Sequence, residues 1–162
     1  MPERPEHPEL SARPELPRLH FPSIRLRARE RDGQVEVWDA LRGAYLVLTP
    51  EEWVRQHLIA YLISHCEALP LRIVQEYPVP LNGQAQRADA VVVDDTARPL
   101  LLAECKAPDV PVDRSVFRQA VRYNSVLSAR YVVLTNGLTH YCCEFCDGKY
   151  VPLSSFPRLS RI

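Results

Sequence analysis

The stretch DAVVVDDTARPLLLAECK, residues 89–106, decides the fold of this chain. Two apolar runs flank a short polar turn, which is typical of two antiparallel strands joined by a tight connection. The second run ends with an acid and an amine, Glu104 and Lys106, on either side of Cys105. Residues two apart in a strand point to the same face of a sheet, so Glu104 and Lys106 are predicted to share one face. Counting back from the turn places Asp89 about level with the Glu104 end of the second strand.

More strands are predicted before this hairpin. LRIVQEYPVPL, residues 71–81, reads as a third strand that reaches residues 89–106 through an Asn82-Gly83 turn. Nearer the N-terminus, IRLRARE and QVEVWD alternate polar and apolar residues around an Asp32-Gly33 turn. That pattern is a strong short-range signal for a β-hairpin.

Two helices are predicted around these strands. TPEEWVRQHLIAYLIS carries Thr49 as the N-cap, Pro50 as the first helical residue and Glu52 as the third, which makes a capping box. Asp113 caps a second helix over DRSVFRQAVRYNSVLSA, and RYVVLTNG and THYCCEF follow as two more strands. We therefore expect an α/β fold of the α+β kind, with a mixed central sheet in αβββαβ order after an N-terminal β-hairpin.

The composition sets limits on the function. With 162 residues and 46% hydrophobic content, residues 21–162 are expected to form one domain after a proline-rich, disordered tail over residues 1–20. The formal net charge is zero, so any nucleic-acid site must be local. The sequence has no apolar run of about 18 residues, which predicts no membrane span. No secretory signal is recognisable and the five cysteines suit reduced thiols, so we expect a cytoplasmic protein.

The choice of lysine at position 106 is informative. Lys106 and Lys149 are the only lysines among the 20 basic residues of the chain. Lysine is a compact point charge whose pKa can shift, whereas arginine stays charged as a planar fork. A lysine two residues from Glu104 therefore suggests a chemical role. The alternative is that one of the two lysines lies there by chance.

The predicted neighbours Asp89, Glu104 and Lys106 suit phosphodiester hydrolysis. Two carboxylates packed together are unfavourable unless a cation neutralises them, and Mg²⁺ prefers carboxylate oxygens, water and substrate phosphate. A lysine beside such an ion can position the attacking water. The alternative from spacing alone is an exposed Glu104–Lys106 ion pair at a strand end, with Asp89 as a solvated residue.

The pattern as a whole resembles the PD-(D/E)XK nuclease superfamily. Asp89, Glu104 and Lys106 match its D…E-x-K motif within the expected element order, and Gln119 and Tyr123 match the Q-x-x-x-Y element on the following helix. Residues 24–150 look most like the N-terminal nuclease domain of type I restriction enzyme R subunits. The resemblance implies a restriction-endonuclease-like fold and a metal-dependent nuclease acting on nucleic acid, most naturally DNA.

The resemblance also implies roles for individual residues. Asp89 and Glu104 would bind Mg²⁺ or Mn²⁺, with the backbone carbonyl of Cys105 as a third ligand. Lys106 would orient or activate the attacking water.

Other residues are implied to surround that metal. Gln119 and Tyr123 would line the site together with Arg122. An acidic residue of the first helix, Glu52 or else Glu51, would complete the metal site, although the capping box already uses Glu52. The sequence has no G-x-x-x-x-G-K-[ST] motif, so we expect no ATP-driven motor in it.

Two other functions stay open at this stage. The same fold could bind nucleic acid or a partner protein without cutting. Alternatively, Cys142, Cys143 and Cys146 could ligate a structural metal with Cys66 or His140, although a strand points Cys142 and Cys143 to opposite faces. The sequence leaves the oligomeric state open, a homodimer included.

Overall fold

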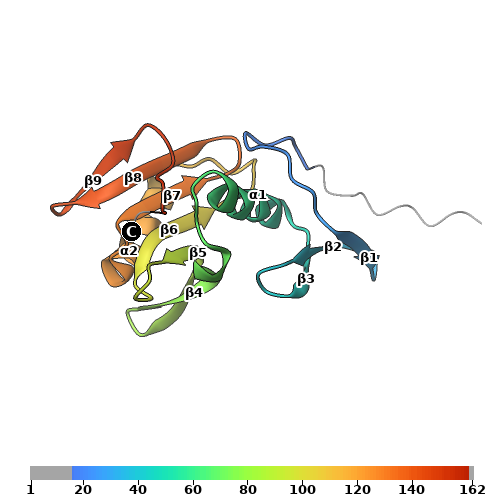
Figure 1. Ribbon diagram of the computed structural model, residues 1–162, viewed down its shortest axis with the longest axis horizontal. Coiled ribbons are helices and arrows are strands. Elements are labelled where there is room, and N and C mark those ends of the chain that lie inside the picture. The colour runs from blue at the N-terminus through green and yellow to red at the C-terminus, as the bar shows by residue number, and fades with distance from the viewer. Residues whose placement is uncertain (1–15, 161–162) are drawn as a thin grey trace, which may run out of the picture.

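The computed structural model describes residues 16–160 and contains two separate β-sheets and two α-helices. One sheet has three strands and the other has six, and Figure 1 shows the smaller sheet at one side of the molecule. The strands of the small sheet are β1 (Ala28–Arg31), β2 (Gln34–Asp39) and β3 (Ala44–Val47). The large sheet consists of β4 (Ile73–Leu81), β5 (Gln84–Val93), β6 (Pro99–Cys105), β7 (Tyr131–Thr135), β8 (His140–Cys146) and β9 (Lys149–Leu153).

The large sheet is mixed, as the sequence predicted. Its strands follow one another in chain order, and all neighbours are antiparallel except β6 and β7. A parallel pair needs a crossover connection, which helix α2 (Arg114–Leu127) provides. The predicted αβββαβ order is confirmed, and β9 extends the sheet by one strand that the sequence analysis missed.

The two helices cover opposite faces of the large sheet. Helix α1 (Pro50–Ser64) packs on one face through Leu58 and Leu62, which are fully buried with Ala103 of β6. Helix α2 packs on the other face, where Ala120 and Leu102 belong to a second apolar cluster. None of the helices in the described part of the chain is long and apolar enough to cross a membrane.

The start of α1 corrects one sequence prediction. Thr49 is the N-cap and its Oγ1 accepts a hydrogen bond from the Glu52 amide at 3.0 Å. The reciprocal half of the capping box is not formed, because the Glu52 carboxylate instead contacts Arg55 and Gln56 further along the helix. The cap is therefore a simple N-cap, in which the first orphan amides are only partly satisfied by side chains.

The small sheet is anchored to the body of the protein by one buried carboxylate. Asp39, at the end of β2, accepts hydrogen bonds from the side-chain amides of Gln56 in α1 (3.1 Å) and Gln75 in β4 (2.7 Å). Val37, two residues earlier and on the same face, is also buried. The inner face of the small sheet is therefore held against both α1 and β4.

The boundary of the predicted tail is also corrected. Residues 1–15 lie outside the described part, but residues 16–20 pack against the domain. Leu19 is buried in the cluster beneath α1, and the Pro17 carbonyl accepts a hydrogen bond from Trp53 Nε1 at 2.9 Å. The apolar side chain of Leu19 finds a buried site there, so the ordered chain begins earlier than its proline content indicated.

Candidate active site

Asp89 and Glu104 lie side by side where strands β5 and β6 separate. The ladder between the two strands ends with Ala90 opposite Ala103. Beyond that pair, Asp89 Oδ2 accepts a hydrogen bond from the Cys105 amide at 2.7 Å, and the Asp89 amide lies 3.4 Å from Glu104 Oε1. Side-chain carboxylates thus replace carbonyl groups as the partners of the last amides.

A backbone irregularity in β4 accompanies this opening. Gln75 pairs with Ala90 and Tyr77 with Ala88, but the ladder skips Glu76, whose φ of +51° is in the left-handed region. Ala88 and Ala90 then join the apolar clusters on opposite faces of the sheet, although residues two apart in a regular strand share a face. The strand is therefore locally twisted at the position that carries Asp89.

The electrostatics at this point are unfavourable without a cation. Glu104 is only 3% exposed, and burial followed by the nearby charge of Asp89 raises the pKa of its carboxyl group. The charge of Lys106 acts in the opposite direction, which places its ammonium group within electrostatic reach of Glu104. Asp89, Glu104 and Lys106 thus lie near one another where the β5–β6 ladder ends, within the large sheet.

The acidic residue that α1 brings toward this cluster is Glu51. Burial, and then the charge of Asp89, raise the pKa of the Glu51 carboxyl group, while Lys106 lowers it. Glu52, which the sequence analysis placed in the metal site, directs its carboxylate to Arg55 and Gln56 instead. The expected acidic contribution from α1 therefore falls to the neighbouring residue.

Arg55 is a site residue that the sequence analysis did not single out. Its side chain pairs with Glu52, and although burial alone would lower its pKa, that bond and the charges of Glu52 and Asp89 raise it. Arg55 lies four residues after Glu51, a spacing that puts both on one face of a helix. That spacing could have pointed to Arg55 in the sequence. In the structure, Arg55 brings a permanent positive charge within electrostatic reach of Asp89.

Cys105 contributes its backbone rather than its thiol. The thiol is buried in the cluster beneath α1, and burial raises its pKa well above the usual range. The Cys105 amide already binds Asp89. With its thiol buried and its amide bonded, Cys105 could offer only its backbone carbonyl to a metal.

Gln119 and Tyr123 are in direct contact on α2. Gln119 Nε2 donates to the Tyr123 hydroxyl at 3.1 Å, and that hydroxyl lies 3.4 Å from Gln86 Oε1 on β5. The two residues therefore link α2 to the strand that carries Asp89. Arg122, between them in sequence, is exposed and has no ion pair within residues 16–160.

The donor set suits Mg²⁺ better than a metal that needs a protein cage. Asp89 and Glu104 supply hard carboxylate oxygens, and Glu104 is a buried acid that a cation would stabilise in its charged form. Among residues 16–160, no three His, Cys, Asp or Glu side chains gather into a ready-made metal site. Mg²⁺ is held by one or two carboxylates together with water and substrate phosphate, so these residues fit it.

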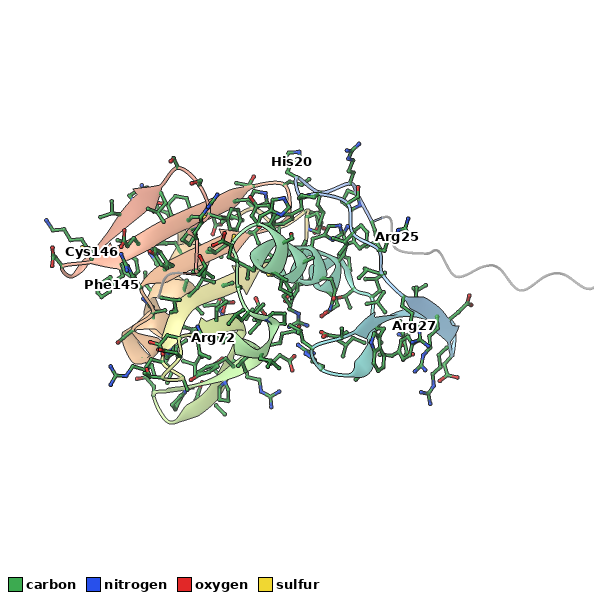
Figure 2. All side chains as sticks on the ribbon, in the orientation of Figure 1. His20, Arg25, Arg27, Arg72, Phe145 and Cys146 are labelled. Atoms are coloured by element: carbon green, nitrogen blue, oxygen red, sulfur yellow. The ribbon has the colours of Figure 1, made fainter. Side chains whose placement is uncertain are left out.

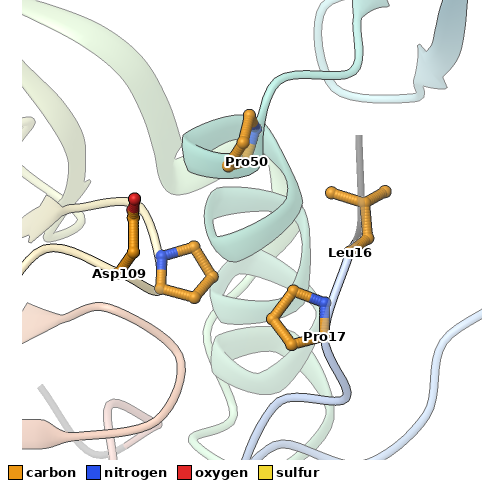
Figure 3. Close-up of a pocket in the computed structure, with 5 residues that line it drawn as sticks. Leu16, Pro17, Pro50 and Asp109 are labelled. Carbon is orange, nitrogen blue, oxygen red and sulfur yellow. The ribbon is translucent and has the colours of Figure 1, made fainter. Parts of the chain in front are cut away.

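An open groove of about 520 Å³ lies between the start of α1, the loop after β6 and residues 16–17. Pro50, which precedes Glu51, and Pro108, which follows Lys106 by two residues, both line it. Figure 3 shows Pro50 at the start of α1, with Asp109 on one side and Leu16 and Pro17 on the other. The loop that follows β6 therefore forms one wall of the groove.

The cysteines do not form a common metal site in this arrangement. Cys142 and Cys143 belong to the apolar clusters on opposite faces of the large sheet, and Cys146 is exposed at the end of β8. Burial raises the pKa of Cys142 to about 12 and that of Cys143 to about 11, so both stay thiols near neutral pH. One ion cannot bind side chains on both faces of the sheet.

Comparisons with known proteins agree with this fold. Residues 50–157 match a family model described as the N terminus of the type I restriction enzyme R protein. A solved structure, a fragment assigned to an HsdR subunit of a type I restriction enzyme from Vibrio vulnificus YJ016, is 24% identical with a TM-score of 0.51. That match covers 68% of this chain and only 24% of the other, and at this identity it shows the fold alone. A search of curated proteins found no match.

Proposed function

Because the chain belongs to the family of type I restriction enzyme R protein N-terminal domains, a nuclease-type module, we propose that it is a Mg²⁺-dependent nuclease that hydrolyses phosphodiester bonds of DNA. The observation that carries the proposal is the meeting of Asp89, Glu104 and Lys106 where β5 and β6 separate. The proposed activity needs no ATP.

Asp89 and Glu104 would hold the metal, with the Cys105 carbonyl as a further ligand. When bound, Mg²⁺ would acidify a water molecule and stabilise negative charge on the reacting phosphate. Glu51 would accept hydrogen bonds from metal-bound water, since its carboxyl group already senses both Asp89 and Lys106. Mn²⁺ has similar ligand preferences and should substitute.

Lys106 would hold the attacking water through its ammonium group. Lys106 directly follows β6, and its amide donates to the Thr135 carbonyl at 2.9 Å, which fixes the base of the side chain. Arg55 would balance the charge of Asp89 and Glu52. Gln119 and Tyr123 would position the DNA backbone or support β5, and Arg122 would contact phosphate from the exposed side of α2.

A second function has one observation in its favour. The Asp89 carboxylate caps the Cys105 amide, and the Asp89 amide faces Glu104, so both acids also help to end the β5–β6 ladder. A nuclease-fold module that binds nucleic acid or a partner without cutting would keep them for this structural reason.

A cleavage assay separates the two functions. Supercoiled DNA, linear duplex, single-stranded DNA and RNA are incubated with Mg²⁺, with Mn²⁺ and with EDTA. We expect metal-dependent cleavage that Lys106→Ala lowers by about 10²–10⁴-fold, as is usual when a positioned catalytic group is lost. Lys149→Ala is the matched control, since Lys149 is the other lysine and is exposed at the start of β9.

Lys106→Arg makes the test sharper. A surface ion pair would accept arginine at a cost of at most about 1 kcal/mol, whereas a water-positioning role would not, because the guanidinium fork is larger and cannot lose its proton. Cleavage near the wild-type rate in Lys106→Arg would show that Lys106 is not the catalytic lysine. Wild-type protein that binds DNA but never cuts it would favour the second function.

A further inference from the structure

The outward face of the small sheet carries arginine side chains over aromatic rings. Neighbouring residues on β1 and β2 are opposite one another as Arg29↔Glu36 and Arg31↔Gln34, and the Trp38 amide bonds to the Arg27 carbonyl at 2.8 Å. Side chains alternate along strands, so this face is opposite to the one that buries Val37 and Asp39. Its members are Arg27, Arg29, Arg31, Gln34, Glu36, Trp38, Tyr45 and Val47.

The arginines on this face are held in place by the rings. Trp38 and Tyr45 pair across β2 and β3, with their ring centroids 5.2 Å apart. Arg29 Cζ lies 3.8 Å from the centroid of Tyr45, and Arg27 Cζ lies 5.8 Å from the centroids of both rings. A guanidinium group stacked on a ring has already lost much of its side-chain freedom, while its N–H groups still point outward in the plane of the fork.

The charge of the face is positive and only partly neutralised. Glu36 is its one acid, and it pairs with Arg29 at 2.6 Å. Arg31 lies 3.8 Å from Asp32, but both side chains are largely exposed, so that pair is weak. Arg27 has no ion pair within residues 16–160, and Figure 2 labels it together with Arg25 at this side of the molecule.

This face is also connected rigidly to the candidate active site. Strand β3 ends at Val47, and α1 begins three residues later, with Glu51, which is within electrostatic reach of Asp89, in its first turn. On β2, Asp39 ties the sheet to α1 and β4. A strand of nucleic acid that lies on this face would therefore be held in a fixed position relative to the carboxylates.

We propose that this outward face, which we term the arginine–aromatic face, binds the phosphodiester backbone of nucleic acid outside the cleavage site. Arg27 and Arg31 would supply the charge-assisted contacts to phosphate, while Arg29 stays paired with Glu36 and braces the rings. The family match begins at residue 50, so this sheet lies outside the part of the chain that the match covers. The proposal rests on the proposed function in one respect, since nucleic acid is the ligand of both sites.

The test is a binding assay carried out in EDTA, so that no cleavage occurs. Fluorescence anisotropy is measured with labelled single-stranded and duplex oligonucleotides over a range of salt concentrations. We expect the variant Arg27→Ala/Arg31→Ala to bind about tenfold more weakly or worse. Its affinity should also depend less on salt, because a protein that makes fewer phosphate contacts releases fewer counterions when it binds. Arg72→Ala/Arg98→Ala removes the same charge just before strands β4 and β6, and Figure 2 shows Arg72 away from Arg27, so this variant should bind like the wild type.

A second measurement reports on the face directly. Trp38 and Trp53 are the only tryptophans, so Trp53→Phe leaves Trp38 as a single fluorescent probe. We expect oligonucleotides to change its emission, and this response should disappear in the Arg27→Ala/Arg31→Ala background.

The outcomes separate this inference from the proposed function. Wild-type affinity in the Arg27→Ala/Arg31→Ala variant, or an equal loss in the control variant, would overturn the inference even if the protein cuts DNA. Loss of binding confined to Arg27→Ala/Arg31→Ala supports it even if no cleavage is found. Binding to polyglutamate that depends on the same arginines, with no binding to oligonucleotides, would identify an acidic protein partner and also overturn it.

Discussion

Glu104 shows how a single residue can oppose the stability of the fold that surrounds it. The side chain is nearly inaccessible, and the closest charge of like sign belongs to Asp89. An ionised carboxylate in that position has little water and an unfavourable neighbour, so the folded protein favours the protonated acid. A bound cation would relieve this electrostatic cost. Functional sites with clustered charges commonly reduce the stability of the protein that carries them.

The first prediction is that Glu104→Gln stabilises the metal-free protein at pH 8. Glutamine keeps an oxygen that can face the Asp89 amide but carries no charge. Because the folded pKa of Glu104 is raised, the unfolded chain binds fewer protons above about pH 4.5, and stability falls as the pH rises from there. We expect a gain of at least about 1 kcal/mol at pH 8, and almost none at pH 4, by chemical denaturation in EDTA.

Asp95→Asn is the control for that measurement, since Asp95 is exposed in the turn between β5 and β6. It should change stability by a few tenths of a kcal/mol at either pH. A Glu104→Gln variant that is less stable than the wild type at pH 8 would mean that the carboxylate is needed for the fold itself.

Some site residues could be predicted from the sequence, and others could not. The short turn joins β5 and β6, so counting from it placed Asp89 near the Glu104 end of β6. A register shift between Val92 and Val93, which the sequence did not reveal, then sets Asp89 beside Glu104. The choice between Glu51 and Glu52 was different, because adjacent helical residues point about 100° apart and the direction of α1 relative to the sheet is set by packing. Arg55 depends on the same orientation.

At the scale of elements, the segment before β1 is held by one close contact. Gly137, in the loop between β7 and β8, has a φ of +85° and its amide bonds to Thr135 Oγ1 at 2.9 Å. A Cβ atom built there would lie 2.6 Å from Leu19 Cδ2. His20 extends the contact, since its amide donates to the Gly137 carbonyl at 2.7 Å.

The second prediction is that Gly137→Ala costs about 2 kcal/mol or more. An alanine there would adopt a left-handed backbone and would also collide with Leu19. Gly43→Ala is the matched control. Gly43 has a φ of +63°, but a Cβ atom built there would have nothing within 4 Å, so only the cost of the left-handed backbone remains. Denaturant unfolding of the two variants gives the difference.

Leu19→Ala completes a double-mutant cycle with Gly137→Ala. Leu19→Ala alone should destabilise the protein by removing buried surface, but it should cost much less in the Gly137→Ala background, where it removes a clash. Additive effects, or equal costs for Gly137→Ala and Gly43→Ala, would mean that residues 16–20 are not docked on the domain.

The elements that the sequence missed have identifiable reasons. Strand β9 follows an Asp147-Gly148 turn of the same kind as Asp32-Gly33, with φ values of +50° and +74°, so its signal was present. The docking of Leu19 had no such signal, because two leucines among prolines, Leu16 and Leu19, are too few to give a periodicity. Its partner site is built from helix and loop residues far away in sequence, which only the tertiary structure brings together.

At the scale of the whole molecule, one helix terminus connects the proposed activities. Helix α1 starts directly after the small sheet and brings Glu51 to the carboxylates, and its next turns bind Asp39 through Gln56. Figure 1 shows α1 close to both sheets. Because only the folded state assembles the site, metal binding at the carboxylates would raise the free energy of unfolding of the entire domain.

The last prediction concerns that coupling between Mg²⁺ and stability. The metal binds ionised carboxylates, and in the metal-free protein Glu104 and Glu51 both have raised pKa values, so protons must leave for Mg²⁺ to enter. The increase in melting temperature produced by Mg²⁺ should therefore grow as the pH rises from 5.5 to 8.5. At about ten times the Kd the added stability is about 1.4 kcal/mol, which corresponds to a shift of a few degrees.

Asp89→Asn keeps an oxygen for the Cys105 amide but loses a ligand charge, and it should lose most of the shift, whereas Asp95→Asn should keep it. A shift that is equal at both pH values, or that survives in Asp89→Asn, would place the Mg²⁺ somewhere other than between Asp89 and Glu104.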